Sequence, residues 1–75
     1  MEEIVKLDKF SASPFKQEIE LQQVEHAADF VNLRLRIREG SRFTVFDIDE
    51  YTALRWGQAL LDWAKTRERI GESAN

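Results

Sequence analysis

Cysteine is absent from the 75 residues, and histidine occurs only once. Disulfides and thiolate metal sites are therefore excluded, and a structural zinc site is disfavoured. The three glycines are isolated, so the chain has no glycine-rich loop that could bind phosphate. The longest apolar run, residues 59–61, is far too short for a membrane span or a signal-peptide core. We therefore predict no cofactor, no metal, no small-molecule ligand and no membrane association.

Charge and apolar content predict one small folded domain over residues 1–75. Hydrophobic residues make up 43% of the chain, which favours a folded over a disordered state. The net charge of −3 disfavours non-specific attraction to nucleic acid or anionic lipid. A chain of this length forms only a small core, so self-association is an expected source of stability. The lack of cysteine is compatible with a reducing compartment, and we expect a cytoplasmic protein.

Alternating apolar and polar residues predict two strands before residue 40. The clearest pattern lies in residues 31–37, where every second residue is apolar and the residues between them are polar. Residues 15–24 alternate in the same way, and residues 26–29 are the expected connection. The segment 39–41 follows as a tight turn, because Gly40 can adopt a positive φ.

The third predicted strand, residues 42–48, carries large apolar side chains on both faces. Two registers fit its sequence. A two-residue loop at Gly40-Ser41 places Phe46 beside the apolar side chains of the preceding strand, whereas a three-residue loop places Phe43 and Val45 there. In either register, aromatic or branched side chains remain on the far face of the sheet.

Residues from about 50 to about 69 repeat apolar positions at spacings of three and four, which predicts an α-helix. Asp49 is a suitable N-cap, and Asp47 with Glu50 forms a rival capping box. Gly71 is a suitable residue to end the helix, and we expect residues 70–75 to be a frayed tail.

The apolar stripe of this helix predicts one buried face. Trp56 and Trp63 lie on the stripe and are expected to pack in the core. Gly57, which also lies there, costs about 1 kcal/mol relative to alanine in a helix. A glycine at this position therefore suggests a close approach between the helix and the sheet.

The predicted fold is α+β: an antiparallel three-stranded β-meander with one C-terminal α-helix packed on one face (βββα). The strand at residues 31–37 is central, and the other two strands are edges. The N-terminal segment, residues 1–14, has two alternatives. It forms a short strand, or it is a poorly ordered start with Phe10 docked on the core.

A run of motifs spans the last two strands and the helix: LRLRIREGSRFT at residues 33–44, FDID at 46–49, TA at 52–53 and WGxAL at 56–60. With these motifs the chain, over residues 18–64, resembles a family of small uncharacterised bacterial proteins. The resemblance implies a compact bacterial cytosolic domain. It implies no activity and no functional residues, because none are assigned to that family.

An arginine row follows the central strand and extends into the next one, and it consists of Arg34, Arg36, Arg38 and Arg42. One interpretation is a platform for an anion or nucleic acid, with Phe43 or Phe46 as a stacking partner. The other interpretation is cross-strand pairing with Glu18 and Glu20, which share a face with the row if the first hairpin closes at residues 26–29. The acidic balance of the chain favours pairing.

Catalysis and cation binding are disfavoured. His26 is the only histidine, the residue type that most often acts as a general base, and no motif places a nucleophile beside it. The acidic segment at residues 47–50 lacks the ligand spacing and the glycine of a cation-binding loop. The start of a helix explains the same residues better.

We therefore predict a non-enzymatic interaction module that forms a homodimer through its sheet or binds another protein. The alternative is a nucleic-acid-binding module that uses the arginine row. Self-association is favoured by the apolar patch on the far sheet face and by the edge strand at residues 42–48, which has no proline or lysine to block pairing. The residues expected to form the interaction surface are Arg34, Arg36, Arg38, Arg42, Phe43, Val45 and Phe46.

Overall fold

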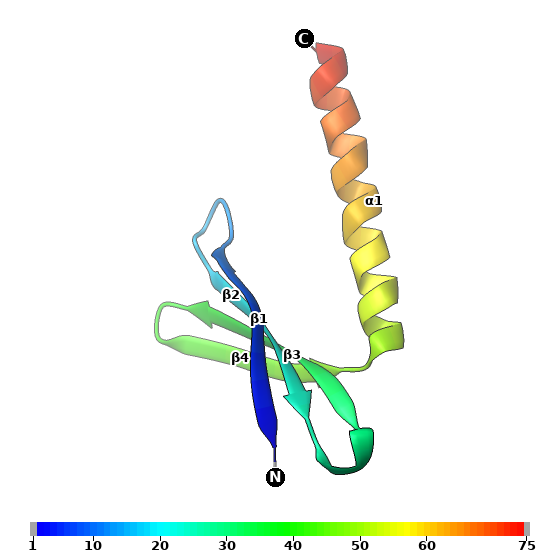
Figure 1. Cartoon of the computed structure of the whole chain (residues 1–75). Helices are drawn as coiled ribbons and strands as arrows, with labels where there is room; N and C mark the ends of the chain where they lie inside the picture. The colour runs from blue at the N-terminus through cyan, green and yellow to red at the C-terminus, as the bar shows by residue number, and fades with distance from the viewer. Residues whose placement is uncertain (1, 75) are drawn as a thin grey trace.

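The computed structural model describes residues 2–74, and the side chains of residues 2–68. In this part of the chain, four antiparallel strands form one sheet in the order β1-β2-β3-β4, and one helix follows the last strand (Figure 1). The elements are β1 (Glu3–Ser11), β2 (Glu18–Glu25), the short 3₁₀ turn η1 (Ala27–Asp29), β3 (Val31–Glu39), β4 (Arg42–Ile48) and α1 (Glu50–Ala74). The fold is therefore α+β, as predicted.

β1 is the strand that the three-stranded prediction omitted. It pairs with β2, so β2 and β3 are interior strands, whereas β1 and β4 are the edges. Of the two alternatives for residues 1–14, the structure shows the strand. The register of the β1–β2 pair shifts between Lys6 and Asp8, which leaves Leu7 as an extra residue in a bulge. This bulge interrupts the two-residue period, and the strand is therefore hard to recognise in the sequence.

The β3–β4 hairpin has the two-residue loop, so the first of the two registers is the one observed. Glu39 pairs with Arg42 across Gly40-Ser41, and Gly40 has a φ of 60°. Leu35 consequently pairs with Phe46. The predicted connection between β2 and β3 is also confirmed, since the N–H of His26 donates to the carbonyl of Phe30 at 2.7 Å.

Alternation along the paired strands gives the sheet two different faces. One surface, the apolar face, carries the polar residues Asp8, Gln23 and Thr44 and the large apolar residues Val5, Phe10, Ile19, Leu21, Leu33, Leu35, Ile37, Phe46 and Ile48. The opposite surface, the arginine face, carries Arg34, Arg36, Arg38, Phe43 and Val45.

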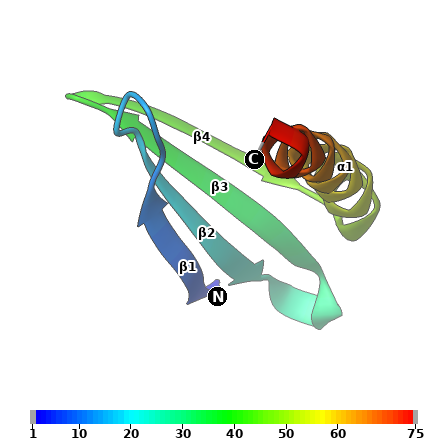
Figure 2. The same ribbon diagram turned by 90° about the horizontal axis from the view of Figure 1, so that it is seen from above.

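The helix does not pack along the sheet, so the predicted packing on one face is wrong. α1 meets the apolar face only through its N-terminal turns and then projects away from it (Figures 1 and 2). There Trp56 stacks on Phe46, with ring centroids 6.1 Å apart, and Ala53 is half-buried. Leu60 and Trp63, which lie further along the same stripe, are 59% and 67% exposed.

The short connection between β4 and α1 explains why the helix diverges. Asp49 is the only residue between them, and it already belongs to the first helical turn. Its carboxylate accepts the N–H of Thr52 at 2.8 Å, which confirms the predicted N-cap, and its carbonyl accepts the N–H of Ala53 at 3.0 Å. Connections between strands and helices usually span about 2–6 residues. A single capped residue leaves no segment in which the chain can turn back over its own sheet.

Two further expectations about the helix are wrong. α1 continues through Gly71 to Ala74 instead of ending near Arg69. No neighbouring atom lies within 4 Å of the position that a Cβ on Gly57 would occupy, so the helix makes no close approach to its own sheet there. Asn75 lies outside the described residues, and the frayed tail stays a prediction.

The core of the chain is small. Among the described side chains, Val24 and Leu35 are the hydrophobic ones that are buried. The radius of gyration is 15.5 Å, compared with about 11 Å for a compact domain of this length. The accessible surface of 6449 Å² exceeds the value expected for a monomer of this mass by roughly 1,700 Å². A single copy therefore leaves an unusually large area uncovered.

Candidate interaction site

The arginine face is organised by the pairing of three strands. β3 places Arg36 opposite Glu20 of β2 and Val45 of β4, and it places Arg38 opposite Glu18 and Phe43. The predicted closure of the first hairpin at residues 26–29 produces this arrangement. The predicted cross-strand pairing of arginines with glutamates is therefore confirmed.

Two of these ion pairs are long and partly exposed. Arg36 Nη1 lies 3.8 Å from Glu20 Oε1, and Arg38 Nη1 lies 3.5 Å from Glu18 Oε2. Lys6 of the edge strand β1 also approaches Glu20, at 4.0 Å. Exposed pairs of this kind add little stability, because water screens them and long side chains lose rotamer entropy. Their main effect is to place a carboxylate beside each of these two cations.

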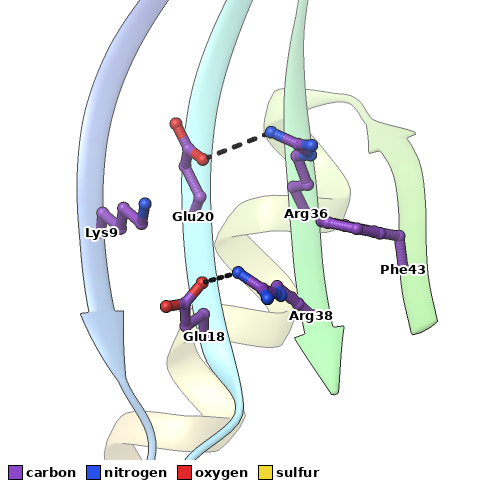
Figure 3. A pocket seen from close by; sticks show the side chains of 6 residues that line it. All are labelled: Lys9, Glu18, Glu20, Arg36, Arg38 and Phe43. Atoms are coloured by element: carbon purple, nitrogen blue, oxygen red, sulfur yellow. Dashed lines mark ion pairs between the residues drawn. The ribbon is translucent and has the colours of Figure 1, made fainter. Parts of the chain in front are cut away.

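Phe43 fills the space between the two arginines. The guanidinium carbons of Arg36 and Arg38 lie 4.8 Å and 5.9 Å from the centre of its ring, which is cation–π geometry. The shallow pocket in Figure 3 has a volume of about 120 Å³ and is lined by Lys9, Glu18, Glu20, Arg36, Arg38 and Phe43. Ligand sites usually measure roughly 300–1,000 Å³. The pocket therefore has room for a side-chain tip or a small ion.

Arg34 makes the strongest ion pair on this face, and its partner is Asp47 of β4. Arg34 Nε donates to Asp47 Oδ1 at 2.8 Å, and Nη2 donates to Oδ2 at 3.0 Å, which is the bidentate geometry. Sequence reasoning assigned Asp47 to the start of the helix and missed this role. The register with the two-residue loop would have predicted this pair, because it places Asp47 directly opposite Arg34.

This contact predicts a loss of stability in acid. The hydrogen bonds from Arg34 hold the pKa of Asp47 below its ordinary value of 3.8 and raise the pKa of Arg34. Because the folded pKa of Asp47 is lowered, its contribution is complete above the ordinary aspartate pKa and is lost as pH falls through the folded value. We expect the melting temperature, followed by circular dichroism, to fall progressively below about pH 4.

Asp47→Asn is the matched variant for this prediction, because it keeps the shape but removes the titration. It should melt at a lower temperature at pH 7 and show a smaller acid decline than the wild type. A smaller decline should remain, because hydrogen bonds from Thr52, first from its side chain and then from its backbone, also lower the pKa of Asp49. An unchanged acid decline in Asp47→Asn would contradict the assignment.

The predicted interaction surface is divided between the two faces of the sheet. Arg34, Arg36, Arg38, Phe43 and Val45 do come together on the arginine face. Arg42, which pairs with Glu39, and Phe46, which pairs with Leu35, lie on the opposite side. Phe46 therefore does not join the arginines and contributes to the apolar face instead.

The apolar face is the larger uncovered surface of the sheet. At its centre Leu35 is 7% exposed, whereas Val5, Phe10 and Phe46 towards its edges are 43%, 49% and 37% exposed. α1 begins beside one end of this face, where an open pocket is lined by Gln23, Val31, Asn32, Leu33, Glu50 and Ala53. Apart from this pocket and the stacking of Trp56 on Phe46, α1 makes few contacts with the face in the described chain. It is the kind of patch that small monomers seldom expose.

The acidic segment and His26 are occupied in structural contacts. Asp47 pairs with Arg34, and Asp49 caps the helix. His26 Nε2 lies 3.1 Å from Asn32 Oδ1, and its ring is 5.3 Å from that of Phe30. Within the described residues, no three acidic, histidine or cysteine side chains gather in a way that could hold a metal ion.

No helix in the described part of the chain combines the length and the apolar character needed to cross a bilayer.

Searches among curated proteins and among solved structures produced no match. A family of unknown function, DUF6967, matches residues 1–66, which includes β1 and extends beyond the resemblance over residues 18–64. The bacterial origin implied by that resemblance stays a prediction. Because the match covers most of the sequence, the chain belongs to this family of unknown function.

Proposed function

We propose that the protein is a small cytoplasmic interaction module, without enzymatic activity, that self-associates through the apolar face of its sheet. The observation that carries the proposal is the uncovered apolar face around Leu35, together with a core of only two buried hydrophobic side chains among those described. Small domains with so little core usually gain stability from a further source, such as oligomerisation. A second molecule packed on this face would provide this additional stability.

The arginine face supports a nucleic-acid interface less well. Each of its three arginines lies near a carboxylate, and the shortest of the contacts, Arg34 with Asp47, is bidentate. Binding of phosphate would have to compete with these carboxylates, in a chain whose net charge is −3. The apolar face has no comparable internal partner, and for this reason self-association is the better supported function.

Two matched phenylalanine variants test the proposal. Phe10 is 49% exposed on the apolar face, and Phe43 is 53% exposed on the arginine face. Phe10→Asp should weaken self-association at least about tenfold, because it places an unpaired carboxylate in an apolar contact. Phe43→Asp should leave the association within about threefold of the wild type. Sedimentation velocity over a range of concentrations measures both effects.

The same measurement can refute the proposal. A wild-type chain that stays strictly monomeric at high micromolar concentration would overturn it. Loss of the dimer in Phe43→Asp, with Phe10→Asp unaffected, would move the interface to the arginine face.

A further inference from the structure

The apolar stripe of α1 begins on the apolar side of the sheet. It then continues along the helix beyond the contact with the sheet. Trp56 contacts the sheet through Phe46. Leu60 and Trp63 follow four and seven residues later and therefore lie on the same side of the helix. Seen from the arginine face, the helix passes behind the sheet, on its apolar side (Figure 3). The chain thus has two apolar surfaces, one on the helix and one on the sheet, that meet only at their shared end.

In the described chain these two surfaces do not close on each other. The only connection between them is Asp49, whose carboxylate and carbonyl are both engaged in the first helical turn. Turning the helix down onto its own sheet would require that turn to open. Within the described residues, the apolar face is therefore left without a covering element from its own chain.

We propose that the occupant of the apolar face is the α1 helix of a second copy, and that the two copies exchange their helices reciprocally. This inference rests on the proposed function, and it adds the identity of the partner element. In a dimer with a two-fold axis, the helix of each copy covers the sheet of the other. The two uncovered surfaces of each chain are then buried at once.

The uncovered area is sufficient for such a dimer. Each copy exposes roughly 1,700 Å² more than a compact monomer of its mass. If both copies buried this excess, the interface would total about 3,400 Å², which is within the range of obligate homodimers.

The dimensions of the helix and the sheet also match. The stripe from Ala53 to Ala64 is about 17 Å long at the helical rise per residue. The four strands of the sheet span about 14 Å from the first to the last at the usual strand spacing. The stripe can therefore cross the whole sheet of a partner.

Gly57 gives an independent indication. It lies in the middle of the stripe, and the position of its missing Cβ has no neighbour within 4 Å in one copy. A glycine there destabilises the helix and improves no contact within the chain. In the exchanged dimer, it would allow the backbone of the helix to approach the partner closely. The opposite side of the helix carries polar residues, among them Gln58 and Asp62, which would face water.

Mixed single-cysteine variants test this arrangement, because the chain has no cysteine of its own. Leu60→Cys on the stripe is mixed with ¹⁵N-labelled Leu21→Cys on the apolar face, the subunits are allowed to exchange, and the mixture is oxidised. Helix exchange predicts a mixed disulfide, identified by its mass, in up to about half of the dimers. Gln58→Cys, on the polar side of the helix, replaces Leu60→Cys as the control and should give little mixed product.

The outcomes separate this inference from the proposed function. Disulfides formed only between two Leu21→Cys chains would mean that two sheets pack face to face, and the helix exchange would be wrong. Dimers linked only between Leu60 positions would mean that the helices pair with each other, which also overturns it. Absence of any dimer in sedimentation would refute the proposed function itself. Isotope-filtered NOEs between Trp63 and sheet methyl groups in a mixed dimer of the unmodified chain provide a second measurement that needs no substitution.

Discussion

Trp63→Ala is expected to dissociate the proposed helix-exchanged dimer, raising its Kd at least about thirtyfold, which corresponds to a hot-spot loss of roughly 2 kcal/mol. Trp63 is 67% exposed in a single copy, so its removal costs the individual chain little. In the exchanged dimer its indole lies on the partner's sheet, where a large aromatic side chain contributes more than most residues. Sedimentation equilibrium or light scattering at several concentrations measures the change.

Tyr51→Ala is the matched control for this variant. Tyr51 is an aromatic residue of the same helix, it is 76% exposed, and it lies on the side opposite the stripe. Its removal should leave Kd within about threefold of the wild type. If both substitutions have equal effects, the stripe of the helix is not the contact surface.

Leu35→Ala is expected to give the largest loss of folding stability, about 2–5 kcal/mol. Leu35 is buried at the centre of the sheet, on an interior strand, and pairs with Leu21 and Phe46. Truncation would remove its apolar contacts with these neighbours, which the hydrogen-bonded strands cannot move together to replace. Because small domains have only about 5–15 kcal/mol of stability in total, this variant should unfold at much lower urea concentrations.

Val45→Ala serves as the control for Leu35→Ala. Val45 is 49% exposed on the arginine face, and its truncation should cost less than about 1 kcal/mol. Both unfolding curves must be recorded at the same protein concentration, since dissociation and unfolding are linked in a dimer. Equal losses in the two variants would place the core elsewhere.

The sequence predicted most of the hairpin of β3 and β4. Alternation in residues 31–37 identifies β3 directly, because one face is apolar and the other is polar. Gly40 marks the turn, and the presence of Glu18 and Glu20 in β2 predicts the pairing with the arginines. The register of β4 could not be chosen beforehand, since Phe43 and Phe46 are equally suitable for an apolar face. Consequently Asp47, the best-placed partner of Arg34, was missed.

The position of the helix could not be predicted from its amphipathic pattern. A stripe such as that of Trp56 and Trp63 shows that a helix has an apolar surface, but the pattern does not identify the surface that covers it. The decisive feature is the single residue Asp49 between β4 and α1. It can be recognised only when both boundaries are known, and boundaries are the least certain part of a sequence-based prediction.

The bulge at Leu7 also limits how far the chain can assemble. It distorts the outer strand β1, which in addition carries Lys6 and Lys9, and both features discourage another strand from pairing there. An open-ended fibril would need every molecule to offer two complementary edges. With β1 obstructed, β4 is the remaining free edge among the described strands. A contact between two copies of β4 uses the one unobstructed edge of each chain, so strand addition alone joins no more than two chains.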